Sequence, residues 1–209
     1  MDRPCLLVTG FEPFGPYADN PSQDIAKAVD GRVVNEAVVR GAVLPVHHAQ
    51  AAAVLASLLD EVEPFAVLHL GLAAGRARLA LERVALNVMD YELPDAAGYR
   101  ARGEPCVRGG PAAHLSTLPL ADILGAITAA GIPAYLSNTA GTYLCNQTMY
   151  WSLHEAQRRR PRPHIGFMHL PLLPAMVAAS GADAPSMEFG LMLRAVEVAL
   201  SVMARESKE

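Results

Sequence analysis

The sequence predicts a single α/β domain, an α/β/α sandwich around a mostly parallel twisted sheet. Strand-like apolar runs alternate with helical patterns along the chain, and this alternation is typical of helices that cover both faces of a parallel sheet. The 209 residues are 52% hydrophobic, which is enough for one sizeable core. No repeated, low-complexity or linker-like segment divides the chain, so residues 1–209 are expected to form one domain.

The first half of the chain is predicted to hold four strands and two helices. An apolar run at 5–9, a valine-rich alternating run at 32–44 and runs at 66–70 and 84–90 have the pattern of strands. Residues 21–29 and 47–59 have helical spacing. Asn20 precedes a proline at the first helical position, so it is expected to cap the first of these helices.

The second half begins with a loop-rich stretch at 94–111 and then returns to alternation. Helices are predicted at 119–130, closed by Gly131, and at 142–159. Strands are predicted at 134–136 and 164–169. The last element is an amphipathic helix at 186–204, with Ser186 as its expected cap.

Cys145 lies in a segment that suits an activated thiol. A β-like run at 133–136 ends in a polar, glycine-containing turn, and a helical pattern starts near Tyr143. Cys145 therefore falls in the first turn of a helix, where unpaired backbone N–H groups and the macrodipole favour a thiolate and lower the thiol pKa. The same N–H groups can hold an oxyanion. The alternative is that Cys145 is a small core residue, since free cysteine is often buried.

A possible base for this thiol is His169. It ends a short buried strand just before a proline-rich loop. Ligands gather at the carboxyl ends of strands in open α/β sheets, so His169 is expected to emerge where sites form. From there it can take the thiol proton and later return it to a leaving group. His69, in contrast, lies inside an apolar run and is interpreted as a core histidine.

A carboxylate is needed to orient the imidazole, and Glu82 is the first candidate. It stands at the mouth of a strand-like segment in an otherwise apolar stretch. The alternative interpretation is a surface pair between Glu82 and Arg83 at the start of a strand. Glu12 and Asp90 are rival carboxylates for the same role.

Four ordered blocks of the sequence carry a family resemblance. They are residues 8–15 with 20–22, residues 75–76 with 82–85 and 87, residues 137–142 with 145–146, and residues 166–169 with 170–171. In these blocks the chain resembles pyroglutamyl peptidase type I (pyrrolidone-carboxylate peptidase), a family of cysteine peptidases. The likeness extends from Leu7 to about Leu200.

The resemblance implies a catalytic triad of Glu82, Cys145 and His169. It implies a thiol protease that removes an N-terminal pyroglutamyl residue from peptides through a thioacyl-enzyme, without a cofactor. It also implies a homotetramer, and it suggests that Asn20 belongs to the substrate side of the first loop. The chain departs from the family pattern at Leu72, where the family usually has Gln, and at Glu92, where it usually has Arg.

The expected substrate pocket is formed by residues beside the predicted strand ends. Phe11 and Phe14 follow the first strand, so they lie over the site if the strands leading to Cys145 and His169 run parallel to it. Two aromatic rings in a turn suit a small flat lactam, or they anchor the loop to the core. Tyr143 and Leu144, next to the predicted nucleophile, are the other expected walls, and Leu72 is expected to contribute through its backbone.

Composition limits the kinds of binding partner and the cellular compartment that are expected. The formal charge of -4 and the lack of a basic stripe argue against nucleic acid. No run reaches the length of a membrane span and no secretory signal is recognised, so a cytoplasmic protein is expected. Three cysteines fit a reducing compartment better than a disulfide framework. No His/Cys cluster has metal-ligand spacing, so no metal is predicted.

Two other functions remain open at this stage. The first is a non-catalytic relative that binds a lactam or a peptide, which Leu72 and Glu92 make conceivable. The second is a nucleotide- or phosphate-binding loop at residues 71–76. That loop lacks both the dinucleotide glycine spacing and the phosphate-binding lysine, so its signal is weak.

Overall fold

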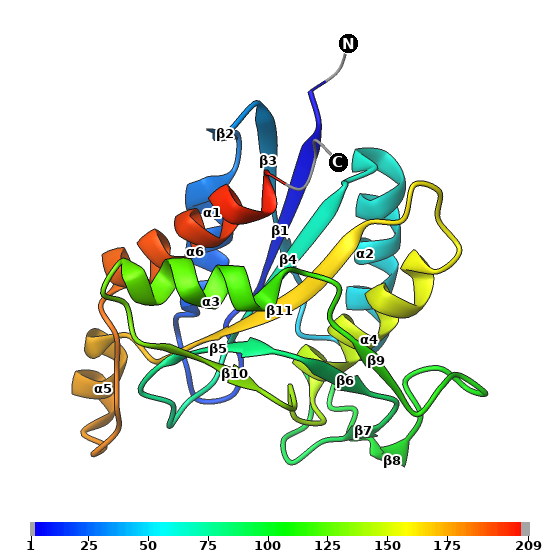
Figure 1. Cartoon of the computed structure of the whole chain (residues 1–209). Helices are drawn as coiled ribbons and strands as arrows, with labels where there is room; N and C mark the ends of the chain where they lie inside the picture. The colour runs from blue at the N-terminus through cyan, green and yellow to red at the C-terminus, as the bar shows by residue number, and fades with distance from the viewer. Residues whose placement is uncertain (1–2, 206–209) are drawn as a thin grey trace.

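A seven-stranded sheet forms the centre of the computed structural model, which describes residues 3–205 (Figure 1). From one edge to the other the strands are β10 (Ala134–Ser137), β5 (Leu79–Glu82), β11 (His164–Leu170), β4 (Ala66–Leu72), β1 (Cys5–Phe11), β3 (Ala37–Leu44) and β2 (Val33–Val34). The α/β class and the sheet that were predicted are confirmed.

The strands of this sheet do not all run in the same direction. The four central strands β11, β4, β1 and β3 are parallel. In contrast, β5 pairs antiparallel with β11, and β10 pairs parallel with β5, so both strands at one edge are reversed. At the other edge β2 is antiparallel to β3. The sheet is mostly parallel, as expected, but the reversed edge matters for the site.

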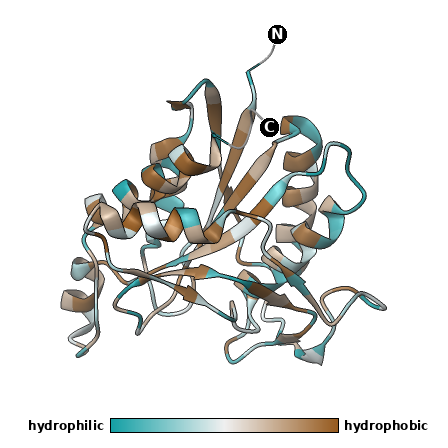
Figure 2. Ribbon diagram, in the orientation of Figure 1, coloured by the Kyte–Doolittle hydropathy of each residue, from teal (hydrophilic) through white to brown (hydrophobic). Residues whose placement is uncertain are grey.

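Helices cover both faces of the sheet. On one face lie α1 (Pro21–Val29), α3 (Leu120–Ala129) and α6 (Phe189–Met203), and on the other lie α2 (His48–Val62) and α4 (Leu144–Ala156) (Figure 1). Strand alternation divides the core between the faces: Leu6 and Val8 pack under the first group of helices, and Leu7 packs under the second. Figure 2 shows the central strands as mainly hydrophobic, as burial on both faces requires.

The first helix lies very close to the strands that it covers. A Cβ atom on Gly10 would be 2.0 Å from the carbonyl oxygen of Ser22, and one on Gly41 would be 2.0 Å from that of Ala26. Asn20 caps this helix as predicted, because its side-chain oxygen accepts from the backbone N–H of Ser22 at 3.1 Å. Its amide also donates to the carbonyl of Glu12 at 3.0 Å, which fastens the loop after β1.

Several predicted strands have different bounds in the structure. The run at 32–44 is a hairpin, because Asn35 and Glu36 take positive φ values of 47° and 81° between β2 and β3. The run at 84–90 divides into β6 (Val84–Leu86) and β7 (Met89–Asp90), which lie outside the main sheet. They pair with β9 (Ala113–Leu115) and β8 (Arg102–Glu104). The main-sheet strand here is β5, just before the predicted one.

Two details near the C-terminal end were wrong in the prediction. The last helix begins at Phe189 and is capped by Glu188, whose carboxylate accepts from Leu191 N at 3.0 Å. Ser186 is therefore not the cap, and it lies in a short bridge with Leu172 instead. The short helix α5 (Pro174–Ser180) was not predicted, because proline at its start has the pattern of a loop as well.

Within residues 3–205, no helix combines the length and the apolar character needed to cross a membrane.

Replacing Asn20 by alanine is expected to destabilise the fold by about 2 kcal/mol. The substitution removes the helix cap and leaves the buried partners of the side chain without hydrogen bonds. The measurement is urea unfolding followed by circular dichroism. Asn20→Asp is the matched control, since it keeps the accepting oxygen and loses only the donor to Glu12, so it should cost less. A wild-type midpoint for Asn20→Ala would contradict this role.

Candidate active site

Glu82 and His169 lie on the same face of the sheet, at the junction of β5 and β11. In the antiparallel pairing Glu82 is opposite Phe167, so alternation places its side chain diagonally beside that of His169. The His169 Nδ1 atom donates to Glu82 Oε1 at 2.8 Å. Glu82 is fully buried and His169 is 4% exposed. The surface interpretation of Glu82 is therefore wrong.

Cys145 reaches the same place from the start of α4. Gly71 of β4 is opposite His169 in the parallel pairing, so it faces the same layer. A Cβ atom on Gly71 would be 2.8 Å from Cys145 Sγ and 2.7 Å from the Phe167 ring. Glycine at this position thus leaves the space in which the thiol lies, at the carboxyl end of β4.

The route of Cys145 to this edge differs from the expected one. Phe11 and Phe14 were expected over the site if the strands leading to Cys145 and His169 ran parallel to β1; β11 does so, but β10 is antiparallel to β11. Residues 138–143 and the first turn of α4 bring Cys145 next to Gly71. The predicted placement of Cys145 in the first turn of a helix is confirmed, since α4 begins at Leu144.

Arg76 is a second partner of the buried carboxylate, a contact that its place in the sequence did not predict. Its Nη1 atom lies 2.7 Å from Glu82 Oε1, the same oxygen that accepts from His169. The other carboxylate oxygen, Oε2, is buried without a hydrogen-bond partner among the described residues. The hydroxyl of nearby Ser137 donates to the carbonyl of Thr139 at 3.2 Å. The carboxylate is thus held from one side by an imidazole and a guanidinium.

The charge states of this pair follow from burial and from their contact. Burial raises the pKa of Glu82, but the hydrogen bond and charge of His169, with smaller contributions from Ser137 and Arg76, outweigh it and keep that pKa below its usual value. Burial lowers the pKa of His169, and the contact with Glu82 offsets this only in part. At neutral pH the site therefore holds an ionised Glu82 beside a neutral imidazole.

Burial also decides the state of the thiol, against the prediction. We expected the start of α4 to lower the pKa of Cys145, yet burial and, to a smaller extent, the charge of Glu82 raise that pKa to about 12. Arg76 and the backbone N–H of Cys145 act in the opposite direction and are weaker. The thiol of the free protein is accordingly protonated at neutral pH.

Asn146 fixes the start of α4 in the structure. Its side-chain oxygen accepts from Leu86 N at 2.8 Å, and its amide donates to the carbonyls of Leu86 and Val88 at 2.9 and 3.0 Å. The N-cap residue Tyr143 provides no side-chain hydrogen bond to the helix. The first N–H groups of α4, around Cys145, are therefore left without a side-chain cap.

A small pocket opens beside the thiol. Its lining residues are Phe11, Phe14, Asn20, Val46, Leu72, Tyr143, Leu144 and Cys145. The structure thus brings together all six residues that we predicted for substrate binding. Val46 was missed, because a lone valine before a helix has no distinguishing signal. Leu72 is 6% exposed and packs with Leu172 and Met176, so its side chain is a wall of the pocket.

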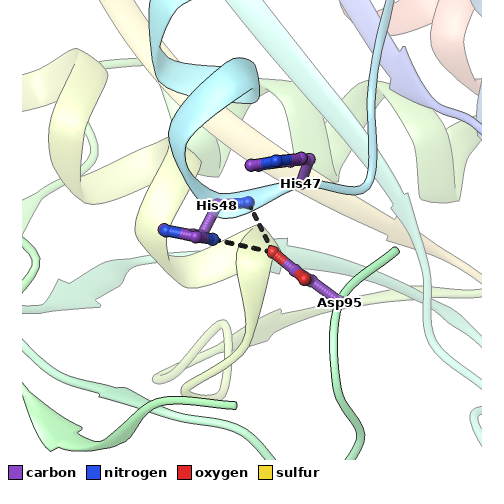
Figure 3. A group of neighbouring side chains, drawn as sticks. All are labelled: His47, His48 and Asp95. Carbon is purple, nitrogen blue, oxygen red and sulfur yellow. Dashed lines mark hydrogen bonds and ion pairs between the residues drawn. The ribbon is translucent and has the colours of Figure 1, made fainter. Parts of the chain in front are cut away.

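One group in the described chain has the composition of a metal site: His47, His48 and Asp95, whose ligand atoms lie within 4.8 Å of one another (Figure 3). Its atoms are already engaged. The Asp95 carboxylate accepts from the backbone and ring nitrogens of His48 and from the N–H groups of Ala97 and Tyr99. His47 Nδ1 accepts from backbone N–H groups at the start of α2. We therefore interpret the group as an anchor for the loop that contains Asp95.

His69 is a core residue, as predicted. It is fully buried, its Nδ1 atom lies 2.7 Å from Thr9 Oγ1, and its Nε2 atom lies 3.0 Å from Ser152 Oγ. Burial lowers its pKa to about 3, so the ring is neutral. Cys5 and Cys106 are half-buried free thiols, distant in sequence from the site.

The sequence model of one protein family, described as pyroglutamyl peptidase, matches residues 5–206 of the chain. The chain belongs to the pyroglutamyl peptidase family. It is 43% identical to the pyrrolidone-carboxylate peptidase of Pyrococcus furiosus over 204 residues, which is 96% of this chain and 98% of that protein. The corresponding protein of Deinococcus radiodurans is also 43% identical, over 98% of this chain and 96% of its own length.

Solved structures of the family agree with the fold. A crystal structure of pyrrolidone carboxyl peptidase from Pyrococcus furiosus matches with a TM-score of 0.94 at 42% identity, covering 97% of this chain and 99% of that one. Arg76, the cation of the loop at residues 71–76, pairs with Glu82. This pairing argues against a nucleotide- or phosphate-binding role for that loop. The relatives named above are peptidases, which gives no support to a non-catalytic function.

Alkylation of Cys145 by iodoacetamide is expected to accelerate continuously from pH 7 to pH 10. Since burial raises the thiol pKa to about 12, the thiolate fraction should still be rising where a free cysteine, with a pKa of about 8.5, has reached its plateau. The measurement is the rate of modification at Cys145 by peptide mass spectrometry, with a short unstructured cysteine peptide as the free-thiol comparison. A plateau below pH 8.5 would show that the helix start outweighs burial.

Proposed function

We propose that this member of the pyroglutamyl peptidase family is a cysteine exopeptidase that uses Cys145 as nucleophile, His169 as base and acid, and Glu82 as the orienting carboxylate. The observation that carries the proposal is the buried contact between Glu82 and His169 Nδ1, on the face where the Cys145 thiol lies beside Gly71. With Nδ1 engaged by the carboxylate, His169 presents Nε2 as its free nitrogen, which is the arrangement of a catalytic triad.

Acylation starts from the neutral pair of thiol and imidazole. His169 Nε2 takes the thiol proton while Sγ bonds to the pyroglutamyl carbonyl carbon, and the carbonyl electron pair moves to oxygen. The uncapped N–H groups at the start of α4 stabilise this oxyanion. When the carbonyl re-forms, the C–N bond breaks and the imidazolium gives its proton to the departing amine. Glu82 stabilises the imidazolium in between.

Deacylation repeats these transfers with water in place of the thiol. His169 removes a proton from a water molecule, the resulting hydroxide attacks the thioester carbonyl, and the C–S bond breaks. The thiolate recovers a proton from His169, so that free pyroglutamate leaves and the starting state returns. These two steps require no cofactor.

The pocket beside Cys145 suits a cyclised N-terminus. A pyroglutamyl residue has no ammonium group, so it needs apolar walls and a few hydrogen bonds rather than a carboxylate. Phe11, Phe14, Tyr143 and Leu144 supply such walls, and Asn20 is the polar residue of the lining. The ammonium group of an ordinary N-terminus would lose its water there without gaining a partner, so peptides with a free N-terminus are disfavoured.

The remaining expectations are predictions about the whole protein. We infer that residues 1–209 act as one catalytic domain, that the protein assembles into a homotetramer, and that it works in the cytoplasm. The resemblance to the family supports the tetramer, and the odd number of cysteines supports a reducing compartment.

The decisive assay compares amide substrates that differ only in the N-terminal residue. We expect hydrolysis of a chromogenic pyroglutamyl amide and essentially none of the prolyl and alanyl amides. Cys145→Ser should lose nearly all turnover while its circular dichroism spectrum stays unchanged, because the hydroxyl has too high a pKa for the same weak base. Equal turnover of the three amides, or an active Cys145→Ser protein, would refute the proposal.

The reductions in kcat caused by Glu82→Gln and by His169→Ala are expected not to be additive. Each should lower kcat by orders of magnitude, since Glu82 acts only through the imidazole of His169. The double variant should therefore be no slower than His169→Ala alone by more than a few-fold. The measurement is a double-mutant cycle on the pyroglutamyl amide. Additive losses would mean that Glu82 contributes independently of His169.

A further inference from the structure

A second, larger pocket adjoins the one beside the thiol. Its lining residues are Phe14, Asp90, Glu92, Leu93, Gly141, Thr142 and Tyr143. Two of them, Phe14 and Tyr143, also line the first pocket, and their rings lie 6.0 Å apart between centroids. Residues 141–143 lead directly into Leu144 and Cys145, so the second pocket begins where a chain attached at the thiol would leave.

The walls of this second pocket are fastened to one another. Thr142 accepts at its carbonyl from Asp90 N at 3.0 Å, and its hydroxyl donates to the Asp90 carbonyl at 2.7 Å. The Tyr143 hydroxyl donates to the Pro94 carbonyl at 3.2 Å. The pocket is therefore formed before any ligand arrives.

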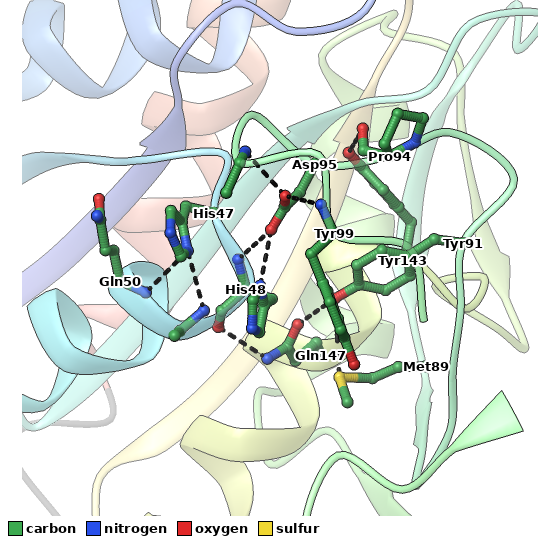
Figure 4. Close-up of polar contacts among 12 residues, drawn as sticks. His47, His48, Gln50, Met89, Tyr91, Pro94, Asp95, Tyr99, Tyr143 and Gln147 are labelled. Atoms are coloured by element: carbon green, nitrogen blue, oxygen red, sulfur yellow. Dashed lines mark hydrogen bonds and ion pairs between the residues drawn. The ribbon is translucent and has the colours of Figure 1, made fainter. Parts of the chain in front are cut away.

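The loop after Leu93 is held from its other side as well (Figure 4). Asp95 accepts from His48, whose ring stacks on Tyr99 at 3.8 Å between centroids. Gln147 of α4 donates to the carbonyl of His48, and the Tyr91 hydroxyl donates to Gln147. The segment that carries Glu92 and Leu93 thus lies between two anchors, at Tyr91 and at Asp95.

The second pocket has a negative wall. Asp90 and Glu92 are exposed, and neither forms an ion pair within residues 3–205, while no basic side chain lines the pocket. The arginines nearest to Asp90 in the sequence form no ion pair with Asp90 or Glu92 in the described part of the chain; Arg83 donates to Asn138. Arg100 donates to the Tyr91 carbonyl, and Arg102 is opposite Asp90 in the β7–β8 pairing without an ion pair to it. Asp90 thus has a basic residue opposite it in the strand pairing, and we take Glu92 as the main source of negative charge in the pocket.

We propose that this second pocket receives the residue that follows pyroglutamate, and that Glu92, assisted by Asp90, gives it a preference for lysine or arginine. The inference rests on the proposed function, since it places the pyroglutamyl ring in the first pocket and the scissile carbonyl at Cys145. The methylene stem of a lysine or arginine packs on Leu93 and Phe14, while its charged end stays in water beside Glu92. An acidic residue at the same place meets two like charges and no partner.

The test uses pyroglutamyl dipeptide amides in which the second residue is lysine, alanine or glutamate. For the wild type at low ionic strength, kcat/KM should fall in that order, with lysine favoured over glutamate by about tenfold, and the ratio should shrink towards unity in 0.5 M NaCl, as for exposed charges. Glu92→Gln should reduce the ratio several-fold, and Glu92→Lys should bring it to unity or invert it. Because the ratio is taken within each variant, a general loss of activity does not obscure it.

The matched control is Glu61→Lys, which makes the same change in net charge at an exposed position of α2, and it should keep the wild-type ratio. A wild-type ratio near unity, or an unchanged ratio in both Glu92 variants, would overturn the subsite. A ratio that shifts equally in Glu61→Lys would show an effect of net charge alone and would also overturn it. Failure of the proposed function is a separate result, in which none of the three amides nor the chromogenic pyroglutamyl amide is hydrolysed.

Discussion

The buried carboxylate of Glu82 is the constraint on which the rest of the site depends. A carboxylate without water is tolerated only when cations or hydrogen-bond donors surround it, and here one oxygen, Oε1, receives both His169 and Arg76. Removing Arg76 would leave the buried carboxylate without its cation, and removing His169 would take away one of its two hydrogen-bond donors. The positions of β5, of β11 and of the loop with Arg76 are therefore linked through a single atom. This is why the reversed strand β5 belongs to the proposed catalytic site as much as to the sheet.

The same burial shapes the proposed chemistry. Burial raises the pKa of the Cys145 thiol and lowers that of the His169 imidazole, so both are neutral and no ion pair forms between them before substrate arrives. Charge then develops only during the reaction, beside a fixed carboxylate and fixed N–H groups that need no reorganisation. A neutral lactam enters such a pocket without a desolvated charge of its own. Specificity for a cyclised N-terminus and the low reactivity of the resting thiol thus have one physical cause.

Beyond the thiol, the walls of both pockets are held by side chains that take no part in the proposed chemistry. Asp95 uses all its accepting positions on His48, Ala97 and Tyr99, and these hydrogen bonds lower its pKa although burial opposes them. These hydrogen bonds hold the loop with Asp95 against the start of α2. Glu92 and Leu93, just before this loop, line the second pocket. A group that resembles a metal site is in this way explained as the support of a binding surface.

The sequence by itself determined the α/β class, the place of Cys145 in the first turn of α4, the core position of His69 and the cap at Asn20. Each of these depends on local pattern or on neighbouring residues. It also singled out Glu82, Cys145 and His169, although from the residues alone Glu82 remained ambiguous with a surface pair. Tertiary structure decided what depends on long-range pairing: the antiparallel β5, the role of Arg76, and the space at Gly71. It also reversed the expected pKa of Cys145. A helix start acts on a thiol locally, whereas dehydration depends on every element packed around it, and no stretch of sequence contains that information.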